Sequence, residues 1–122
     1  MKFIGISRDF SLKNEDQYNT IGAFWDEMAE LYGLESLLGL GYKWDDGMIS
    51  YAIGLKDGAI AGANLKLELP DNGWAVVKGR TDDLKRIYDE IYRSGRLKME
   101  IEEFTTGGDC VIRYLRRSEE YD

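Results

Sequence analysis

The segment Leu97–Phe104 carries the side chains best suited to chemistry in this chain. Its residues alternate with the period of a β-strand, which places Leu97, Met99 and Ile101 on one face and Lys98, Glu100 and Glu102 on the other. Phe104 falls on the face of Glu102, so a ring and a carboxylate lie two residues apart. The ring offers apolar area and a negative π-face, and the carboxylate offers charge, a combination that suits an organic cation.

The alternative interpretation is that Glu102 is solvated on an exposed face of the sheet. Unpaired glutamates are rarely buried, so this segment alone does not decide between the two. Glu100 shares the face of Glu102, and we expect it at the rim of any pocket or in solvent.

Composition limits the possible partners. The 122 residues are 43% hydrophobic and 32% charged, which is typical of one globular domain with its own core. The net charge of −7 argues against a nucleic-acid partner, which requires a basic surface. No apolar segment approaches the roughly 20 residues of a membrane span, and no signal peptide is visible, so we expect no membrane partner. A single cysteine favours a reducing, cytoplasmic compartment.

The chain contains no histidine, which excludes Ser-His-Asp and Cys-His catalysis and histidine-based metal sites. Cys110 has no histidine to activate it, so we expect a small strand residue rather than a reactive thiol. Gly107 and Gly108 form a turn and not a phosphate loop, because no helix start follows them. We therefore predict no metal, no cofactor and no dedicated catalytic residue.

Hydrophobic periodicity predicts the elements that position these residues. Strands are expected over residues 2–7, 48–55, 64–69, 74–79, 97–104 and 110–115. Helices are expected from about residue 18 to Gly33 and from Thr81 to Gly95, since each contains an apolar stripe at helical spacing. The stripe of the first helix comprises Ile21, Phe24, Trp25, Met28, Leu31 and Tyr32. Residues 34–40 are expected to be a short helical turn, residues 42–47 a turn-rich connector and residues 116–122 a charged tail.

The predicted order is strand-helix-strand-strand, twice. It indicates one α+β domain over residues 1–122, with pseudo-repeat halves at about 1–70 and 73–117 and antiparallel sheets. Two such halves leave a cleft where they meet, and ligand sites favour such seams.

Short motifs in this order resemble a known family. They are Asn19 to Trp25 at the helix start, Tyr51 to Gly54 in a strand, Gly73 to Val76 after the proline turn, Ile87 with Tyr88 in the second helix, and Ile101 to Phe104. The last is similar to the apolar-Glu-x-aromatic signature of the GyrI-like small-molecule-binding domains. These are also called AraC-type effector-binding domains, and they include standalone, integron-associated members.

The resemblance implies a duplicated strand-helix-strand-strand fold around a central ligand cleft. It implies that Glu102 is the buried pocket glutamate, which in multidrug-sensing relatives faces lipophilic cations. Phe104, Tyr51, Tyr114 and Trp25 would be aromatic pocket walls by the same analogy, although Trp25 suits a core position equally well. The expected role is a standalone effector-binding protein related to transcription regulators.

Two other functions stay open at this stage. Glu102 could serve a small-molecule hydrolase as base or nucleophile, with a tyrosine hydroxyl as acid. Alternatively, the acidic surface could inhibit a basic protein partner such as DNA gyrase. The chain also departs from the family pattern, with Ile91 in place of a common tryptophan and Arg116 in place of a proline. Arg113 and Arg116 bring positive charge toward the cleft rim, which leaves the charge of the ligand open.

Overall fold

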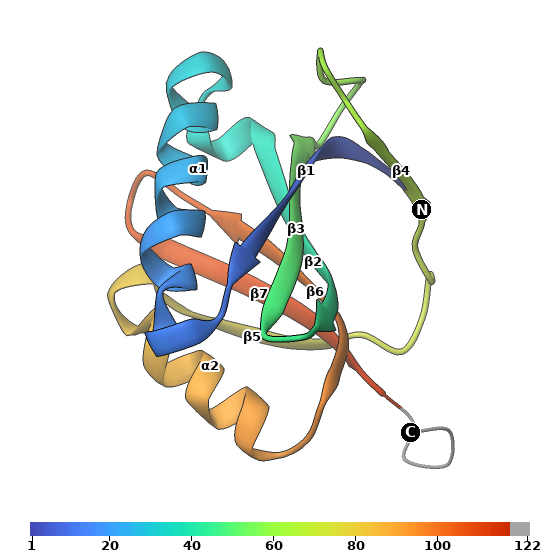
Figure 1. Ribbon diagram of the computed structural model, residues 1–122. Helices are drawn as coiled ribbons and strands as arrows, with labels where there is room; N and C mark the ends of the chain where they lie inside the picture. Colours follow the sequence, from blue (N-terminus) through green and yellow to red (C-terminus); the bar gives the residue numbers. More distant parts are fainter. Residues whose placement is uncertain (118–122) are drawn as a thin grey trace.

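Two helices pack on one face of a seven-stranded antiparallel sheet in the computed structural model, which describes residues 1–117 (Figure 1). The strands are β1 (Lys2–Ser11), β2 (Leu37–Asp45), β3 (Met48–Leu55), β4 (Leu65–Glu68), β5 (Ala75–Arg80), β6 (Leu97–Phe104) and β7 (Asp109–Arg116). The helices are α1 (Gln17–Tyr32) and α2 (Leu84–Arg93), with 3-10 turns at Lys13–Glu15, Leu34–Ser36 and Thr81–Asp83. The predicted α+β class is confirmed.

The sheet runs β4-β1-β3-β2-β6-β7-β5. The chain thus follows the order strand-helix-strand-strand in β1-α1-β2-β3 and again in β5-α2-β6-β7. In the sheet, β3 lies between β1 and β2, and β7 lies between β5 and β6. The sets join where Gly39–Gly41 of β2 pair with residues 102–100 of β6. We call this junction the seam, and it places Glu100 and Glu102 at the centre of the sheet.

The interpretation of residues 34–47 as a helical turn and a connector was wrong after Ser36, because β2 begins at Leu37. Gly39 and Gly41 weaken the strand pattern in the sequence. Both glycines are required by close packing, since an added Cβ at Gly39 would overlap the Tyr51 hydroxyl and one at Gly41 would lie 2.8 Å from Glu100 Oε1. β4, predicted as a main strand of the first half, is an edge strand outside β1.

The helices bury the predicted stripes with one exception. In α1, Phe24, Trp25 and Met28 are buried, whereas Leu31 is 69% exposed, so its assignment to the stripe was wrong. Leu31 lies in the last turn of the helix, next to the end of α1 at Tyr32. In α2, the stripe Ile87, Tyr88 and Ile91 is buried as predicted.

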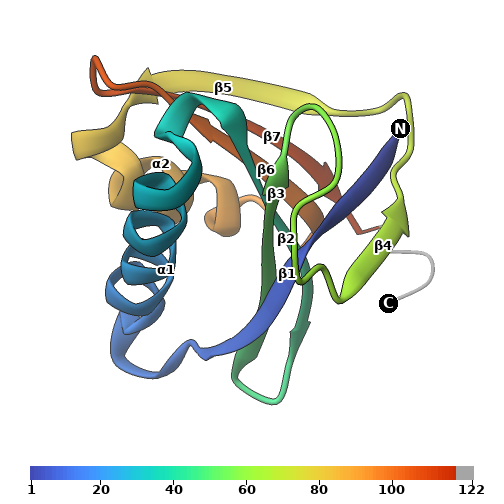
Figure 2. The ribbon, with the colours of Figure 1, turned by 90° about the horizontal axis from the view of Figure 1, so that it is seen from above.

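Figure 2 shows both helices on one side of the central strands and β4 on the other. Each face of the sheet carries its own hydrophobic cluster. The helix-side cluster contains the buried faces of α1 and α2 together with Tyr51, Phe104 and Cys110. The outer cluster is built on Phe3, Leu40, Ala52, Leu69 and Ile101, and it is covered by β4 and the segment that follows. The sheet is therefore a buried central layer along β2, β3 and β6.

The alternation predicted for β6 fails at its start. The β6–β7 register shifts between Leu97 and Met99, and a bulge of this kind reverses the face of the residues before it. Leu97 consequently belongs to the helix-side cluster, whereas Ile101 belongs to the outer cluster. Of the predicted tail, Arg116 ends β7 and residues 118–122 lie outside the described part of the chain. None of the described helices is long and apolar enough to cross a membrane.

The packing of Gly39 gives a first testable prediction. Gly39→Ala would push a methyl group into the Tyr51 hydroxyl and to 2.6 Å from the Trp25 ring, so we expect a loss of about 1–3 kcal/mol in the free energy of unfolding. Gly22→Ala in α1 is the matched control, because its Cβ meets nothing within 4 Å. In urea titrations the control should be stabilised by roughly 0.5–1 kcal/mol. Equal effects of the two substitutions would show that Gly39 is not constrained by these side chains.

Candidate functional site

Glu102 lies in the middle of the sheet and only 4% of it is exposed. It sits on β6 between Gly39 of β2 and Ile112 of β7, on the face covered by the helices. The alternative interpretation of a solvated Glu102 is therefore wrong. Both halves of the chain contribute to its surroundings.

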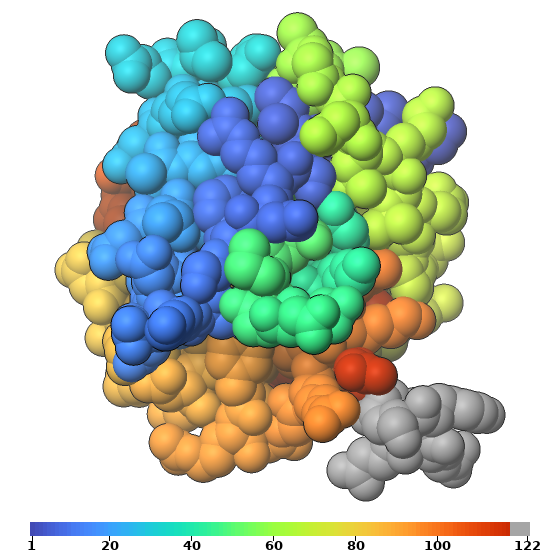
Figure 3. Space-filling view, in the orientation of Figure 1, coloured from blue at the N-terminus to red at the C-terminus, as the bar shows by residue number. Residues whose placement is uncertain are grey.

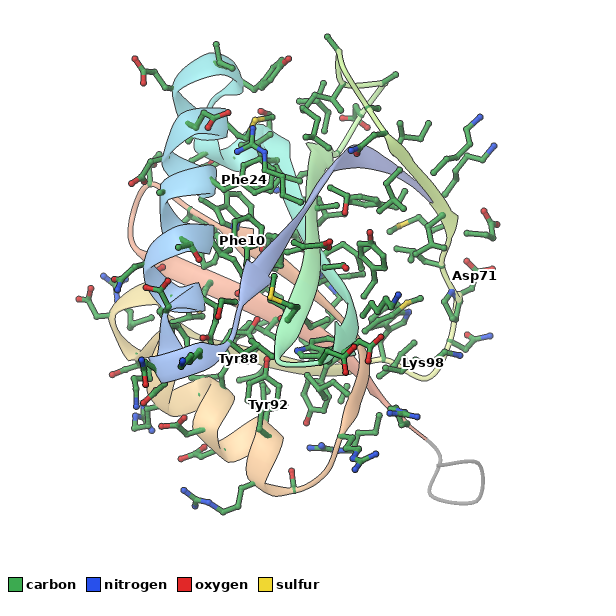
Figure 4. The ribbon with its side chains drawn as sticks, viewed as in Figure 1. Phe10, Phe24, Asp71, Tyr88, Tyr92 and Lys98 are labelled. Atoms are coloured by element: carbon green, nitrogen blue, oxygen red, sulfur yellow. The ribbon has the colours of Figure 1, made fainter. Side chains whose placement is uncertain are left out.

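Three aromatic side chains bind this carboxyl or support its partners. Tyr51 of β3 donates a short hydrogen bond to Glu102 Oε1, and Tyr88 of α2 donates to Oε2 at 2.6 Å. Trp25 of α1 donates its Nε1 hydrogen to the Tyr51 hydroxyl at 2.8 Å, which directs the Tyr51 proton toward Glu102. Figure 4 shows Tyr88 directed from α2 toward the sheet. Both carboxyl oxygens are thus satisfied by neutral donors.

Glu100 lies one position along the same face and is only 3% exposed. Our expectation of a rim or solvent position for Glu100 was wrong, because α2 covers this part of the sheet. Tyr92 of α2 has its hydroxyl 3.4 Å from Glu100 Oε2, a weak hydrogen bond. Gly41 on the neighbouring strand provides the space that the Glu100 side chain fills.

The two carboxyls form a buried acidic pair without a cation. No salt bridge within residues 1–117 involves Glu100 or Glu102. Burial raises the pKa of Glu100 well above its ordinary value, and the charge of Glu102 raises it further. Burial also raises the pKa of Glu102, although the hydrogen bonds from Tyr51 and Tyr88 oppose this shift. The pair therefore favours holding a proton until a positive charge arrives.

The structure brings most of the predicted site residues together. Phe104 is buried and packs edge-on against Trp25, with ring centroids 4.8 Å apart and an interplanar angle of 89°. Tyr51 is buried in contact with Glu102. Tyr114 is half-buried and lies opposite Glu100 across the β6–β7 ladder, so it is a neighbour of Glu100 and not of Glu102.

Three residues of the site were missed or misjudged at the level of sequence. Tyr88 was assigned to the core stripe of α2, Tyr92 was not singled out, and Glu100 was placed in solvent. The spacing of Tyr88 and Tyr92, four residues apart, was the available signal, since it stacks the two rings on one helix face with centroids 5.6 Å apart.

The two arginines that depart from the family pattern are engaged elsewhere. Arg113 forms a short ion pair with Glu103, which also contacts Lys56 Nζ at 3.1 Å. Arg116 Nη1 donates to the carbonyl oxygens of Ile91 and Gly95 at 3.0 and 3.2 Å, so it binds the C-terminal end of α2. These contacts hold both guanidinium groups away from the acidic pair.

A cavity of about 970 Å³ opens beside the acidic pair. It is lined by residues 42–46 of the β2–β3 hairpin, by residues 92, 93 and 95–98 of the α2–β6 connection, and by Arg117. Figure 3 shows the hairpin and this connection meeting on one face of the molecule. We call it the seam cavity. Tyr92, which is 38% exposed, lines the cavity and contacts Glu100, so its ring lies between the cavity and this carboxyl.

Comparison with known proteins gives one fold relationship. No protein-family model matches the chain, and no curated protein matches it. The solved structure of SAV2435 bound to tetraphenylphosphonium is similar, with a TM-score of 0.61 and 17% sequence identity. The match covers 99% of this chain and 91% of that one. At this identity the likeness concerns the fold, and a protein with this fold binds a small organic cation.

Burial of Glu100 predicts how stability depends on pH. Because its pKa is raised in the folded state, its contribution to stability is complete below its ordinary pKa of 4.5 and is lost as pH rises through the folded value. Glu100→Gln mimics the protonated form, so we expect the variant to gain stability over the parent as the pH rises. Urea unfolding at about pH 5 and about pH 9 measures this gain.

Glu30→Gln, on the exposed face of α1, controls for the loss of one carboxyl. The control should keep the pH profile of the parent. A Glu100→Gln profile parallel to that of the parent would contradict the assignment of Glu100 as a buried group with a raised pKa.

Proposed function

We propose that this chain is a small-molecule-binding protein for amphipathic organic cations. Glu102, with Glu100 beside it, would receive the positive charge, and Phe104, Tyr51, Trp25 and Tyr114 would contact the apolar body. The observation that carries the proposal is the buried acidic pair, which is surrounded by aromatic side chains and lacks a cation in residues 1–117.

The physical reason is the cost of an unpaired buried charge. A carboxylate in an apolar core is costly until a cation neutralises it, so an organic cation gains more here than in water. Aromatic rings add apolar contact and cation–π attraction. The charge then provides discrimination between ligands, and the rings provide most of the affinity.

We further propose that the chain is a GyrI-like effector-binding domain. Its repeated order of elements supports a duplicated unit with halves at about 1–70 and 73–117, in one domain. The fold likeness to SAV2435 supports a small organic cation as ligand class. A role related to transcription regulation and a cytoplasmic location rest on the sequence and stay predictions.

Access to the acidic pair would come from the seam cavity. Tyr92 stands between the cavity and Glu100, and its single weak hydrogen bond leaves it easier to displace than Tyr88 or Tyr51. Rotation of Tyr92 would expose Glu100 to the seam cavity.

The hydrolase alternative has less support. Both oxygens of Glu102 accept hydrogen bonds from buried tyrosines and the residue is only 4% exposed, so neither oxygen faces a water molecule that it could deprotonate. An inhibitor of a basic partner such as DNA gyrase stays a prediction without a specific observation in its favour.

The proposal is tested with two ions of the same shape. Tetraphenylphosphonium and tetraphenylborate both carry four phenyl rings on a tetrahedral centre, but their charges are opposite. We expect the parent protein to bind the cation more tightly at the acidic pair. Glu102→Gln should weaken cation binding by about 2 kcal/mol or more, roughly 30-fold, because it keeps the shape and removes the charge. Isothermal titration calorimetry measures both ligands.

Glu103→Gln is the matched control, since it makes the same change on the next residue of β6, where the carboxylate is paired with Arg113 and Lys56. It should bind tetraphenylphosphonium as the parent does, whereas Phe104→Ala should bind both ions more weakly. Unchanged binding of the cation by Glu102→Gln would refute the role of Glu102.

A further inference from the structure

The seam cavity has a charge opposite to that of the rest of the molecule. Among residues 1–117, five lysines and arginines line it, against two aspartates and no glutamate, in a protein with a net charge of −7. The cations are Lys43, Arg93, Arg96, Lys98 and Arg117, and the acids are Asp45 and Asp46 on the hairpin. An excess of positive charge thus gathers in one concave place.

Four of these cations, Lys43, Arg93, Arg96 and Lys98, form no salt bridge within residues 1–117. Elsewhere, Arg8, Arg80, Arg86 and Arg113 each pair with a carboxylate. Arg93 and Arg96 therefore keep N–H donors that an anion can use, although the chain has an excess of acidic residues. The planar guanidinium group matches the geometry of carboxylates and sulfonates.

The walls of the cavity are aromatic. Tyr42, Trp44 and Tyr92 line it, and Tyr92 and Lys98 lie toward the same end of the molecule (Figure 4). Trp44 Nε1 is buried and has no acceptor among the described residues. A buried donor without an acceptor is unusual in a folded protein, and this one belongs to a residue of the cavity wall. The wall therefore combines flat apolar area with the cations of the cavity.

We propose that the seam cavity is a binding site for an aromatic organic anion, an aryl carboxylate or aryl sulfonate. The ring packs against Trp44 and Tyr92, and the acidic group binds Lys43, Arg93, Arg96 and Lys98. The aromatic lining favours a small molecule that carries a ring over an acidic protein surface, because Tyr42, Trp44 and Tyr92 offer flat faces for stacking. This site is separate from the acidic pair, since the charged groups that would hold its anion are not those that would hold the cation.

The experiment uses two dyes with the same rings. The probe is 8-anilinonaphthalene-1-sulfonate, and N-phenyl-1-naphthylamine is its neutral counterpart without the sulfonate. Fluorescence titration of the full chain should show tighter binding of the sulfonate than of the neutral dye. The binding should weaken between about 0.05 M and about 0.5 M NaCl, because added ions screen the charges of the rim.

Variants locate the site. The double variant Lys43→Ala/Lys98→Ala should lose affinity for the sulfonate on the order of tenfold. Lys66→Ala/Lys78→Ala is the matched control, since it removes the same charge from exposed residues of β4 and β5 that also lack salt bridges, and it should bind as the parent does. The neutral dye should bind all three proteins alike, and circular dichroism should confirm that each variant is folded.

Two outcomes overturn the proposal. Equal losses in the two double variants would mean that the sulfonate responds only to net charge, and equal affinity of the parent for both dyes would mean that the cations do not take part. Both readings use the sulfonate and its neutral counterpart and neither uses a cation. A failure of tetraphenylphosphonium binding at the acidic pair would therefore not imitate a failure at the seam cavity.

Discussion

The fold is organised around the desolvation of two carboxyls on one central strand. Glu100 and Glu102 lie on β6 where the two halves of the sheet meet, and no cation within residues 1–117 compensates them. Burying such groups is tolerable only with hydrogen bonds, and neutral donors provide them. α1, β3 and α2 each contribute a donor, in Trp25, Tyr51 and Tyr88. The same contacts that satisfy Glu102 therefore also join the two halves.

The burial of these two carboxyls explains residues that would otherwise seem unfavourable for the fold. β2 carries glycines at positions 39 and 41, residues that disfavour strands, because the side chains of Tyr51 and Glu100 occupy the space above them. Arg116 replaces a proline of the family pattern and binds carbonyl oxygens at the end of α2, the helix that carries Tyr88 and Tyr92. Arg116, which we expected near the cleft rim, thus binds the C-terminal end of α2.

Two environments of opposite charge meet at one side chain. Tyr92 contacts Glu100 with its hydroxyl and lines the basic seam cavity with its exposed part. A lipophilic cation would be favoured on the Glu100 side of the Tyr92 ring and disfavoured in the seam cavity. An anion would show the reverse preference. A molecule carrying both charges would span them, so the position of Tyr92 links the two sites that we propose.

The sequence by itself determined the class of the fold, both helices, most strands and the pairing of Glu102 with Phe104 on one face, because these depend on local periodicity. It could not determine whether that face is covered. Glu100 and Glu102 have the same residue type and spacing as solvated glutamates, and only the docking of α2 and the pairing of β2 with β6 bury them. β2 was hidden because its glycines make room for Tyr51 of β3 and Glu100 of β6, and local periodicity does not show these contacts. The seam cavity was equally invisible, since its cations come from segments about 50 residues apart that only tertiary structure brings together.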